Sequence, residues 1–231
     1  MSDKKHEAMG ATDKIEEGAM EAISKSETYI RNNRNTIITI AVVVLVAIAG
    51  ILAYHYLYKK PRVEKAQAAM FRAEQVFGVD SFALALNGNG ADVVGFLQII
   101  DKYGSTPSGN LAQAYAGISY YNLGEYDKAI EHLKKFKSKD TMANPSVYGL
   151  IGDCYVDMDK VEEGVKYFEK AAERADNDLL SPIYLIKAGI AYEALGNTEK
   201  AKASYQTVLD KYSASDFRVE AEKYLQALEM K

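Results

Sequence analysis

The sequence contains no tryptophan and little cysteine, histidine or proline: its 231 residues include one Cys, three His and four Pro. The lone Cys154 cannot form an intramolecular disulfide, which excludes a disulfide-rich scaffold and a multi-cysteine zinc site. His6, His55 and His132 lie in separate segments, and none has a Cys, His or Asp partner at ligand spacing. We therefore expect neither a metal nor another cofactor.

A strong charge of one sign is also missing, because 28 Lys and Arg are nearly balanced by 32 Asp and Glu, for a net charge of −4. Such a surface has no electrostatic footprint for the phosphates of nucleic acid. No glycine-rich loop follows a strand pattern, and no nucleophile motif is present. We predict that the protein is not an enzyme and has no small-molecule substrate or nucleic-acid partner.

The most apolar part of the chain is the segment IITIAVVVLVAIAGILAYHYLY, residues 37–58, with 22 residues and no Asp, Glu, Lys or Arg. As a helix it is about 33 Å long, enough to cross a hydrocarbon core of about 30 Å. Tyr54, Tyr56 and Tyr58 lie at one end, where an interfacial aromatic belt is expected. A cleaved signal peptide has a shorter apolar region nearer the N-terminus, and a buried soluble helix is rarely so long without charge. We predict a transmembrane helix.

The polar tail before this segment, residues 1–36, carries six Lys or Arg and seven Asp or Glu. Its apolar residues recur at helical spacing, which predicts a short amphipathic helix that Asp13 caps; the alternative is a weakly helical, solvated tail. The residues that define the apolar face are Ile15, Ala19, Ala22, Ile23 and Ile30.

The remaining domain, residues 59–231, begins with a proline-containing basic stretch, YKKPRVEKAQ. Pro61 disfavours helical geometry at the residue before it, so we expect the apolar helix to kink or end at Lys60. An amphipathic run over Val63–Leu86 follows, and NGNG at Asn87–Gly90 predicts a turn.

From there the sequence repeats itself with periods of 35 and 37 residues. The three copies are YAGISYYNLGEYDKAIEHLKKF from Tyr115, LIGDCYVDMDKVEEGVKYFEKA from Leu150 and KAGIAYEALGNTEKAKASYQTV from Lys187. The aligned positions are Gly117, Gly152 and Gly189; Tyr120, Tyr155 and Tyr192; Gly124, Asp159 and Gly196; Ala129, Gly164 and Ala201; Leu133, Phe168 and Tyr205.

These positions resemble the tetratricopeptide repeat, in which helix A and helix B of each unit pack as an antiparallel pair. The first glycine lets the two helices approach closely, and the second ends helix A in a left-handed conformation that Asp159 can also adopt. We expect helix A to be capped by Asn110 in the first repeat, by Asn144 before Pro145 in the second and by Ser181 before Pro182 in the third.

Partial units flank the three repeats. FLQIIDKYGSTP from Phe96 resembles YQTVLDKYSASD from Tyr205, so Asp92–Tyr103 is predicted to be helix B of a degenerate repeat. Phe217–Met230 is predicted to cap the array, with Val219, Tyr224, Leu225 and Leu228 covering the last repeat. The predicted fold is therefore all-α: one transmembrane helix, then an α-solenoid of three clear tetratricopeptide repeats and one degenerate repeat, with a C-terminal capping helix.

In such arrays the helices A line a concave groove, and the resemblance implies which side chains would bind a partner. They are Leu111, Ile118, Tyr121, Asn122, Asp153, Val156, Asp157, Ile183, Ile186, Ile190 and Glu193. This groove is largely apolar, with an acidic patch from Asp153, Asp157 and Glu193, and it suits a helix or an unfolded segment. The alternative is that some of these side chains pack beneath the helix predicted over Val63–Leu86.

The layout of tail, apolar segment and C-terminal repeats resembles the bacterial YfgM family of ancillary Sec translocon subunits. That resemblance implies a single-pass inner-membrane protein with a cytoplasmic N-terminus and a periplasmic repeat domain. It also implies protein partners: translocon subunits, a periplasmic chaperone or an unfolded secreted chain. Flanking charge alone leans slightly toward a cytoplasmic repeat domain. The charges are Lys25, Arg31 and Arg34 on one side, and Lys59, Lys60, Arg62 and Lys65 on the other.

Two other functions fit the same sequence. The protein could be a scaffold or assembly factor of another envelope complex, since tetratricopeptide repeats occur with many functions. It could also be a regulator that acts through the N-terminal tail.

Overall fold

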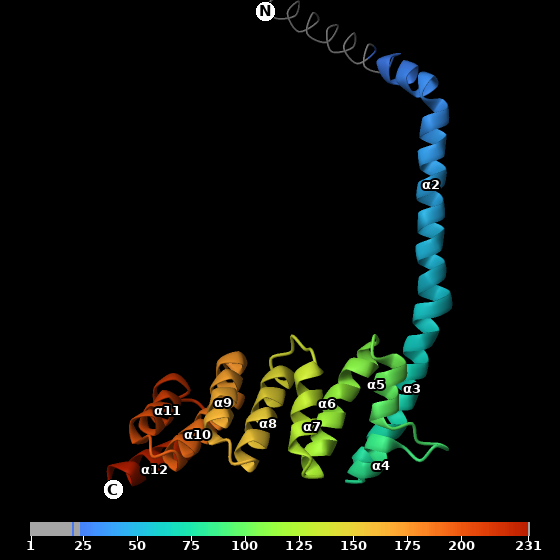
Figure 1. Ribbon diagram of the computed structural model, residues 1–231. Helices are drawn as coiled ribbons and strands as arrows, with labels where there is room; N and C mark the ends of the chain where they lie inside the picture. Colours follow the sequence, from blue (N-terminus) through green and yellow to red (C-terminus); the bar gives the residue numbers. More distant parts are fainter. Residues whose placement is uncertain (1–19, 21–23, 231) are drawn as a thin grey trace, which may run out of the picture. The chain divides into compact units, whose positions relative to one another are not determined.

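The computed structural model describes Met20 and residues 24–230, and every regular element named among these residues is helical (Figure 1). The chain forms two compact units, Met1–Lys60 and Pro61–Lys231, which are considered separately. Most of the amphipathic helix predicted for the tail lies outside the described residues, although residues 24–32 are helical and Ile30 is exposed.

The first unit contains helix α2, Arg34–Ala53, which has no buried residue. Its valine, leucine and isoleucine side chains are exposed around the whole helix. An apolar surface on every side of a helix is typical of a membrane-spanning segment or of a deeply buried helix. Among the described residues, Arg34–Phe77 is the one helical stretch long and apolar enough to cross a membrane.

Of the two outcomes expected at Lys60, a kink or an end of the apolar helix, the end is wrong, because a π-helical segment, Tyr54–Lys59, leads directly into helix α3, Lys60–Phe77. A proline ring normally clashes with the carbonyl four residues earlier. Here the Lys60 amide donates to the carbonyl of His55, five residues earlier, so the turn before the proline is wider than an α-turn. This wider turn accommodates Pro61 without ending the helix.

The amphipathic run predicted over Val63–Leu86 is two helices instead of one. Helix α3 ends at Phe77, and helix α4, Phe82–Asn87, begins after a short turn in which Asp80 adopts a left-handed conformation with φ of 57°. The Phe77 ring lies between the two helices and the repeats, 5.3 Å from the Phe82 ring and 4.9 Å from the Tyr115 ring. The sharp turn thus folds α4 back into the core.

The turn after α4 is longer than the NGNG tetrapeptide. Asn89 organises it, because its side-chain oxygen accepts hydrogen bonds from the amides of Ala91 and Val93, each at 3.0 Å. The helix predicted over Asp92–Tyr103 therefore begins later, as α5, Phe96–Tyr103.

Of the seven helices that follow, the first six form three antiparallel pairs stacked side by side, as the repeats predict, and the seventh is the capping helix (Figure 1). They are α6, Pro107–Asn122; α7, Tyr126–Lys135; α8, Ala143–Asp157; α9, Val161–Ala175; α10, Leu180–Ala194; α11, Thr198–Lys211; and α12, Arg218–Glu229. The helices A of the three repeats are α6, α8 and α10, and their helices B are α7, α9 and α11.

Close contact between helix A and helix B depends on the first repeated glycine. In each repeat this glycine lies against the large side chain sixteen residues later, and a Cβ atom would occupy the same space. That hypothetical Cβ would lie 2.5 Å from Leu133 Cγ on Gly117, 2.5 Å from Phe168 Cε1 on Gly152 and 2.3 Å from Tyr205 Cε1 on Gly189. Carbon atoms in contact are normally about 3.5–4.0 Å apart, so only glycine fits.

The turn between helix A and helix B has the same geometry in all three repeats. Its left-handed residues are Gly124, Asp159 and Gly196, with φ of 75°, 58° and 70°. In the middle repeat the Asp159 amide donates to the Val156 carbonyl at 2.9 Å. The Lys160 amide donates to the Tyr155 carbonyl, also at 2.9 Å. This pair of bonds is the Schellman motif, and Asp159 adopts it as predicted.

The predicted N-caps lie one helical turn too far along the chain. The side chains that accept from first-turn amides are Thr106, Asp140 and Asn177. The predicted caps instead tie each helix A to the C-terminal part of a neighbouring helix B or to the segment after it: the following one for Asn110 and the preceding one for Asn144 and Ser181. Asn110 exchanges two 2.9 Å hydrogen bonds with the backbone of Lys137, and Ser181 donates to the Ala172 carbonyl at 2.8 Å. Asn144 donates to the Ser138 carbonyl at 3.0 Å.

Helix α12 covers the last repeat with a face that differs from the predicted one by a single residue. The Tyr224 ring stacks on the Tyr205 ring at 5.3 Å, Leu225 is half-buried and Leu228 is buried. Val219 is 74% exposed, so its predicted packing role is wrong. Ala221 is buried instead, because it lies three residues before Tyr224 on the same helical face.

We predict that Gly152→Ala lowers the free energy of unfolding by about 1–3 kcal/mol, because the new methyl group overlaps the Phe168 ring. Gly78→Ala is the matched control, since a Cβ there meets only its own helix at 3.4 Å or more. Urea denaturation monitored by circular dichroism measures both. A Gly152→Ala protein as stable as the parent would contradict the close helix contact.

Asp159→Gly is expected to stabilise the protein by about 0.5–1 kcal/mol, because glycine adopts the left-handed conformation without the steric cost that a side chain adds. Gly124→Ala, at the equivalent turn, should destabilise it by about 1 kcal/mol for the same reason. Opposite signs in denaturant melts are the expected result; equal signs would argue against the shared turn geometry.

Candidate partner-binding surface

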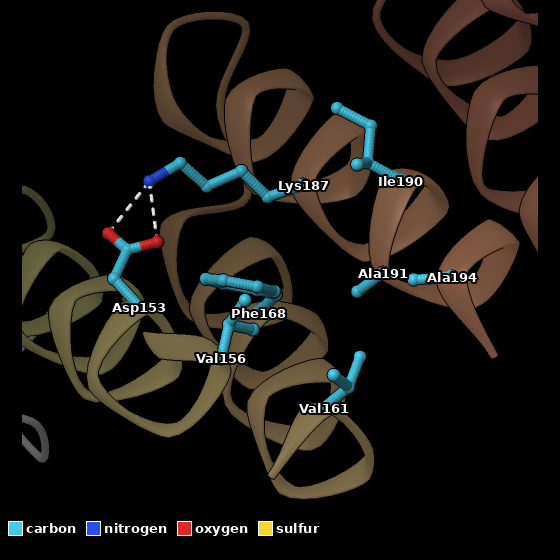
Figure 2. A pocket seen from close by; sticks show the side chains of 8 residues that line it. All are labelled: Asp153, Val156, Val161, Phe168, Lys187, Ile190, Ala191 and Ala194. Carbon is cyan, nitrogen blue, oxygen red and sulfur yellow. Dashed lines mark hydrogen bonds and ion pairs between the residues drawn. The ribbon is translucent and has the colours of Figure 1, made fainter. Parts of the chain in front are cut away.

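Two apolar hollows lie between consecutive helices A. The first, termed the α6–α8 pocket, has a volume of about 460 Å³. Its lining comprises Leu111, Ala114, Tyr115, Ile118, Phe136, Ala143, Ser146, Val147 and Leu150. The second, termed the α8–α10 pocket, has a volume of about 200 Å³ (Figure 2). Its lining comprises Asp153, Val156, Val161, Phe168, Lys187, Ile190, Ala191 and Ala194.

The structure divides the predicted groove residues between these two hollows and their surroundings. Leu111 and Ile118 line the α6–α8 pocket, whereas Asp153, Val156 and Ile190 line the α8–α10 pocket. The remaining predicted residues line neither pocket: Tyr121, Asn122, Asp157, Ile183, Ile186 and Glu193. Among these, Ile186 is only 4% exposed and belongs to the core, so it offers no accessible surface.

The ring of Tyr184 explains why the α8–α10 pocket is confined to one half of the helix pair. Tyr184 of α10 lies directly over Gly149 of α8, where a Cβ would be 2.1 Å from the ring. This contact closes the N-terminal half of the space between α8 and α10. The pocket therefore begins further along α8, at Asp153.

Helix α3 lies beside the array without covering the predicted surface. A third hollow of about 400 Å³ separates them, and it is lined by Gln67, Met70, Phe71 and Glu74 of α3 and by Leu111 of α6, among others. Leu111 remains 40% exposed. Leu111 is thus accessible, and the alternative that α3 buries the predicted groove residues does not hold for it.

The predicted acidic patch is partly compensated within the protein. Lys187 of α10 reaches across the pocket mouth to Asp153 of α8, with its ammonium 2.8 and 2.7 Å from the two carboxylate oxygens (Figure 2). Glu193 accepts a hydrogen bond from the Tyr205 hydroxyl at 2.8 Å. Burial raises the pKa of Tyr205, and this carboxylate raises it further, so the phenol stays neutral.

Tyr121 and Asp157 form a similar neighbouring pair at the C-terminal ends of α6 and α8. Burial raises the pKa of Tyr121, and the nearby Asp157 carboxylate raises it further through charge and a hydrogen bond. A neutral hydroxyl that donates to a carboxylate satisfies one lone pair of the carboxylate without cancelling the negative charge of the carboxylate. Asp157 is exposed and therefore contributes negative charge to this surface.

The pocket residues that sequence reasoning missed include Val161, Phe168 and Lys187. The sequence marked Phe168 only as an aligned position of the repeat; its ring lies against Gly152 of its own repeat and also lines the pocket (Figure 2). Lys187 could have been found from its spacing. It lies 34 residues after Asp153, about one repeat, so the two occupy neighbouring helices A.

Two other polar groups that the sequence singled out, His132 and Cys154, lie in the packed part of the described chain. His132 is half-buried; its ring stacks on the Tyr120 ring at 5.4 Å, and its Nδ1 atom forms a 2.8 Å hydrogen bond with the Gln113 side chain. Burial raises the pKa of the Cys154 thiol to about 12, which keeps it protonated and unreactive. Within the described part of the chain, no group of three or more His, Cys, Asp or Glu could hold a metal ion.

Comparison with known families identifies the repeats. Residues 144–214 match one family model described as tetratricopeptide repeat, and residues 112–140 match a second with the same description. Among curated proteins, the chain is 29% identical over 114 residues to TPR repeat-containing protein MJ1428 of Methanocaldococcus jannaschii. It is 31% identical over 113 residues to Tetratricopeptide repeat protein 1 of Schizosaccharomyces pombe.

These matches cover 49% and 43% of this chain but only 19% and 11% of those longer proteins. Among solved structures, that of the MamA protein aligns with 72% of this chain and 91% of its own, with a TM-score of 0.50 and 19% identity. That likeness concerns the fold alone. Together the comparisons confirm that the chain carries tetratricopeptide repeats, which form interaction surfaces.

We predict that the Asp153–Lys187 pair couples adjacent repeats. Its two side chains are 25% and 39% exposed, so the expected coupling is modest, about 0.5–1 kcal/mol. A double-mutant cycle with Asp153→Asn and Lys187→Met, read by urea denaturation, measures it. The exposed Lys135–Glu131 pair within α7 is the control, and its coupling is expected to be weaker. Zero coupling would show that the pair does not join the repeats.

Proposed function

We propose that this protein is a membrane-anchored protein-interaction module that binds its partner through the helix A surface. The observation that carries the proposal is the pair of apolar hollows between α6, α8 and α10. Concave apolar pockets with a few polar groups at the rim are the usual form of a binding site. The proposed contact residues are Leu111, Ile118, Tyr121, Asn122, Asp153, Val156, Asp157, Ile183, Ile190 and Glu193.

Anchoring is supported by the first unit. Exposed apolar surface in water costs about 25 cal/mol per Å², and the apolar side chains of α2 are exposed around the whole helix. A lipid bilayer removes that cost, and the apolar helix is long enough to cross its hydrocarbon core. We propose that α2 spans the bacterial inner membrane once, with the N-terminus in the cytoplasm and the repeats in the periplasm.

The specific role that we propose is that of an ancillary subunit of the Sec translocon. The overall layout supports it, since a tail, one apolar helix and C-terminal repeats resemble the YfgM family. The partners would be translocon subunits together with a periplasmic chaperone or an unfolded secreted chain. In this role the protein acts by binding and performs no catalysis.

Two alternatives use the same surface differently. As a scaffold of another envelope complex, the repeats would bind subunits of that complex. As a regulator, the protein would act through residues 1–36, and deletion of that tail would abolish its effect while the repeats stay folded. In the translocon role the same deletion should be mild.

Affinity purification from membranes in a mild detergent tests the role. We expect translocon subunits to co-purify, and an Ile118→Glu variant to lose them because the charge enters an apolar pocket. Val219→Glu, at an exposed position of α12, is the matched control. Protease added to spheroplasts should degrade the repeats, which tests the orientation. Recovery of a different envelope complex would replace the translocon role with the scaffold role.

A further inference from the structure

The α8–α10 pocket has the size and the charge to select a particular kind of partner segment. Its volume of about 200 Å³ is below the roughly 300–1,000 Å³ typical of small-molecule sites. Its floor and far wall are apolar: Val156, Val161 and Phe168 face Ile190, Ala191 and Ala194 (Figure 2). A hollow of this size and composition takes one apolar side chain.

The wall on the α8 side carries more negative than positive charge. Asp153 and Asp157 are four residues apart on α8 and therefore lie on the same helical face. Lys187 pairs with Asp153, and at Asp157 the neighbouring Tyr121 hydroxyl is uncharged. Burial is the main cause that raises the pKa of Tyr121 and of Cys154, and the negative charges of Asp153 and Asp157 raise both values further. The field of the two carboxylates therefore acts on two separate groups.

The C-terminal end of α8 adds to this field. Helix α8 ends at Asp157, and the last carbonyl groups of a helix carry a partial negative charge. Asp157 thus lies where a negative side chain and the helix end reinforce each other. A cation placed beside Asp157 would be stabilised by both.

We propose that the α8–α10 pocket binds a partner segment in which an apolar side chain is followed or preceded closely by Lys or Arg. The apolar side chain enters the hollow between Val156 and Ile190, and the basic residue lies against Asp157. This inference rests on the proposed function, since it names the class of segment that the helix A surface takes.

The test uses the full chain in nanodiscs of phosphatidylcholine, a zwitterionic lipid that does not itself attract charged peptides. The probes are three fluorescein-labelled peptides that share a Leu-Ala-Leu-Ala-Leu centre and carry two Lys, two Glu or two Ser at each end. Fluorescence anisotropy, corrected with empty nanodiscs, gives the affinities. In about 0.05 M salt the lysine peptide should bind roughly five- to tenfold more tightly than the glutamate peptide, and the ratio should shrink in about 0.5 M salt.

Two variants locate the effect. Asp157→Asn should reduce the preference for lysine by roughly two- to fourfold, whereas Glu222→Gln on the exposed face of α12 should not change it. Ala194→Leu should fill the pocket and weaken all three peptides by roughly tenfold. Ala194 is exposed at the end of α10, so the larger side chain does not enter the core. Ala227→Leu, exposed on α12, is its control.

Each possible result supports or overturns a specific part of the proposal. Equal affinity for all three peptides, weakened alike by Ala194→Leu, would overturn the charge selection and leave the proposed binding surface in place. Binding that Ala194→Leu does not affect would place the segment elsewhere and overturn this inference. Absence of binding by every peptide would overturn the inference, whereas co-purification of partners that depends on Ile118 would still support the proposed function.

Discussion

The contact between a glycine on helix A and a large side chain on helix B is the constraint on which the repeat domain depends. Because there is no room for a Cβ on Gly117, Gly152 or Gly189, the large side chain of helix B lies directly against the backbone of helix A in each pair. Tight pairs then act as rigid units, and the array grows by stacking them. Between α8 and α10 a comparable contact, Tyr184 over Gly149, closes only part of the space, and the part left open is the pocket.

The space between consecutive helices A is filled unevenly. The Tyr184 ring closes the N-terminal half of the α8–α10 space over Gly149, whereas no large side chain fills the other half. The Asp153–Lys187 pair spans the resulting hollow and joins the two repeats at its mouth (Figure 2). The same gap between helices is therefore a packing site at one end and an open pocket at the other. Binding can occur there without disturbing the core.

Periodicity made the repeat domain predictable, because one period specifies many contacts at once. The glycine, tyrosine and turn positions all fell where the repeat places them, and even Asp159 adopts the expected left-handed conformation. Local polar signals were less reliable. Asn144 and Ser181 look like caps before proline, yet Asp140 and Asn177 perform that function one turn earlier. A side chain that can cap a helix can equally well bond to a neighbouring helix, and sequence alone does not distinguish the two.

The candidate surface was predictable only as a set of positions. Helix periodicity shows which side of α10 faces the groove, but it does not show that Ile186 is 4% exposed and Ile190 43% exposed, because that difference depends on how the neighbouring helices pack. The net charge of the surface also depends on the neighbouring side chains. Asp153, Asp157 and Glu193 look alike in the sequence, but they contact an ammonium group and two neutral phenols, respectively. Lys187 compensates the charge of Asp153, whereas the phenol beside Asp157 is uncharged, and Asp157 is exposed one helical turn after Asp153. The selectivity of the surface thus depends on the partners of its acids, which the three-dimensional packing decides.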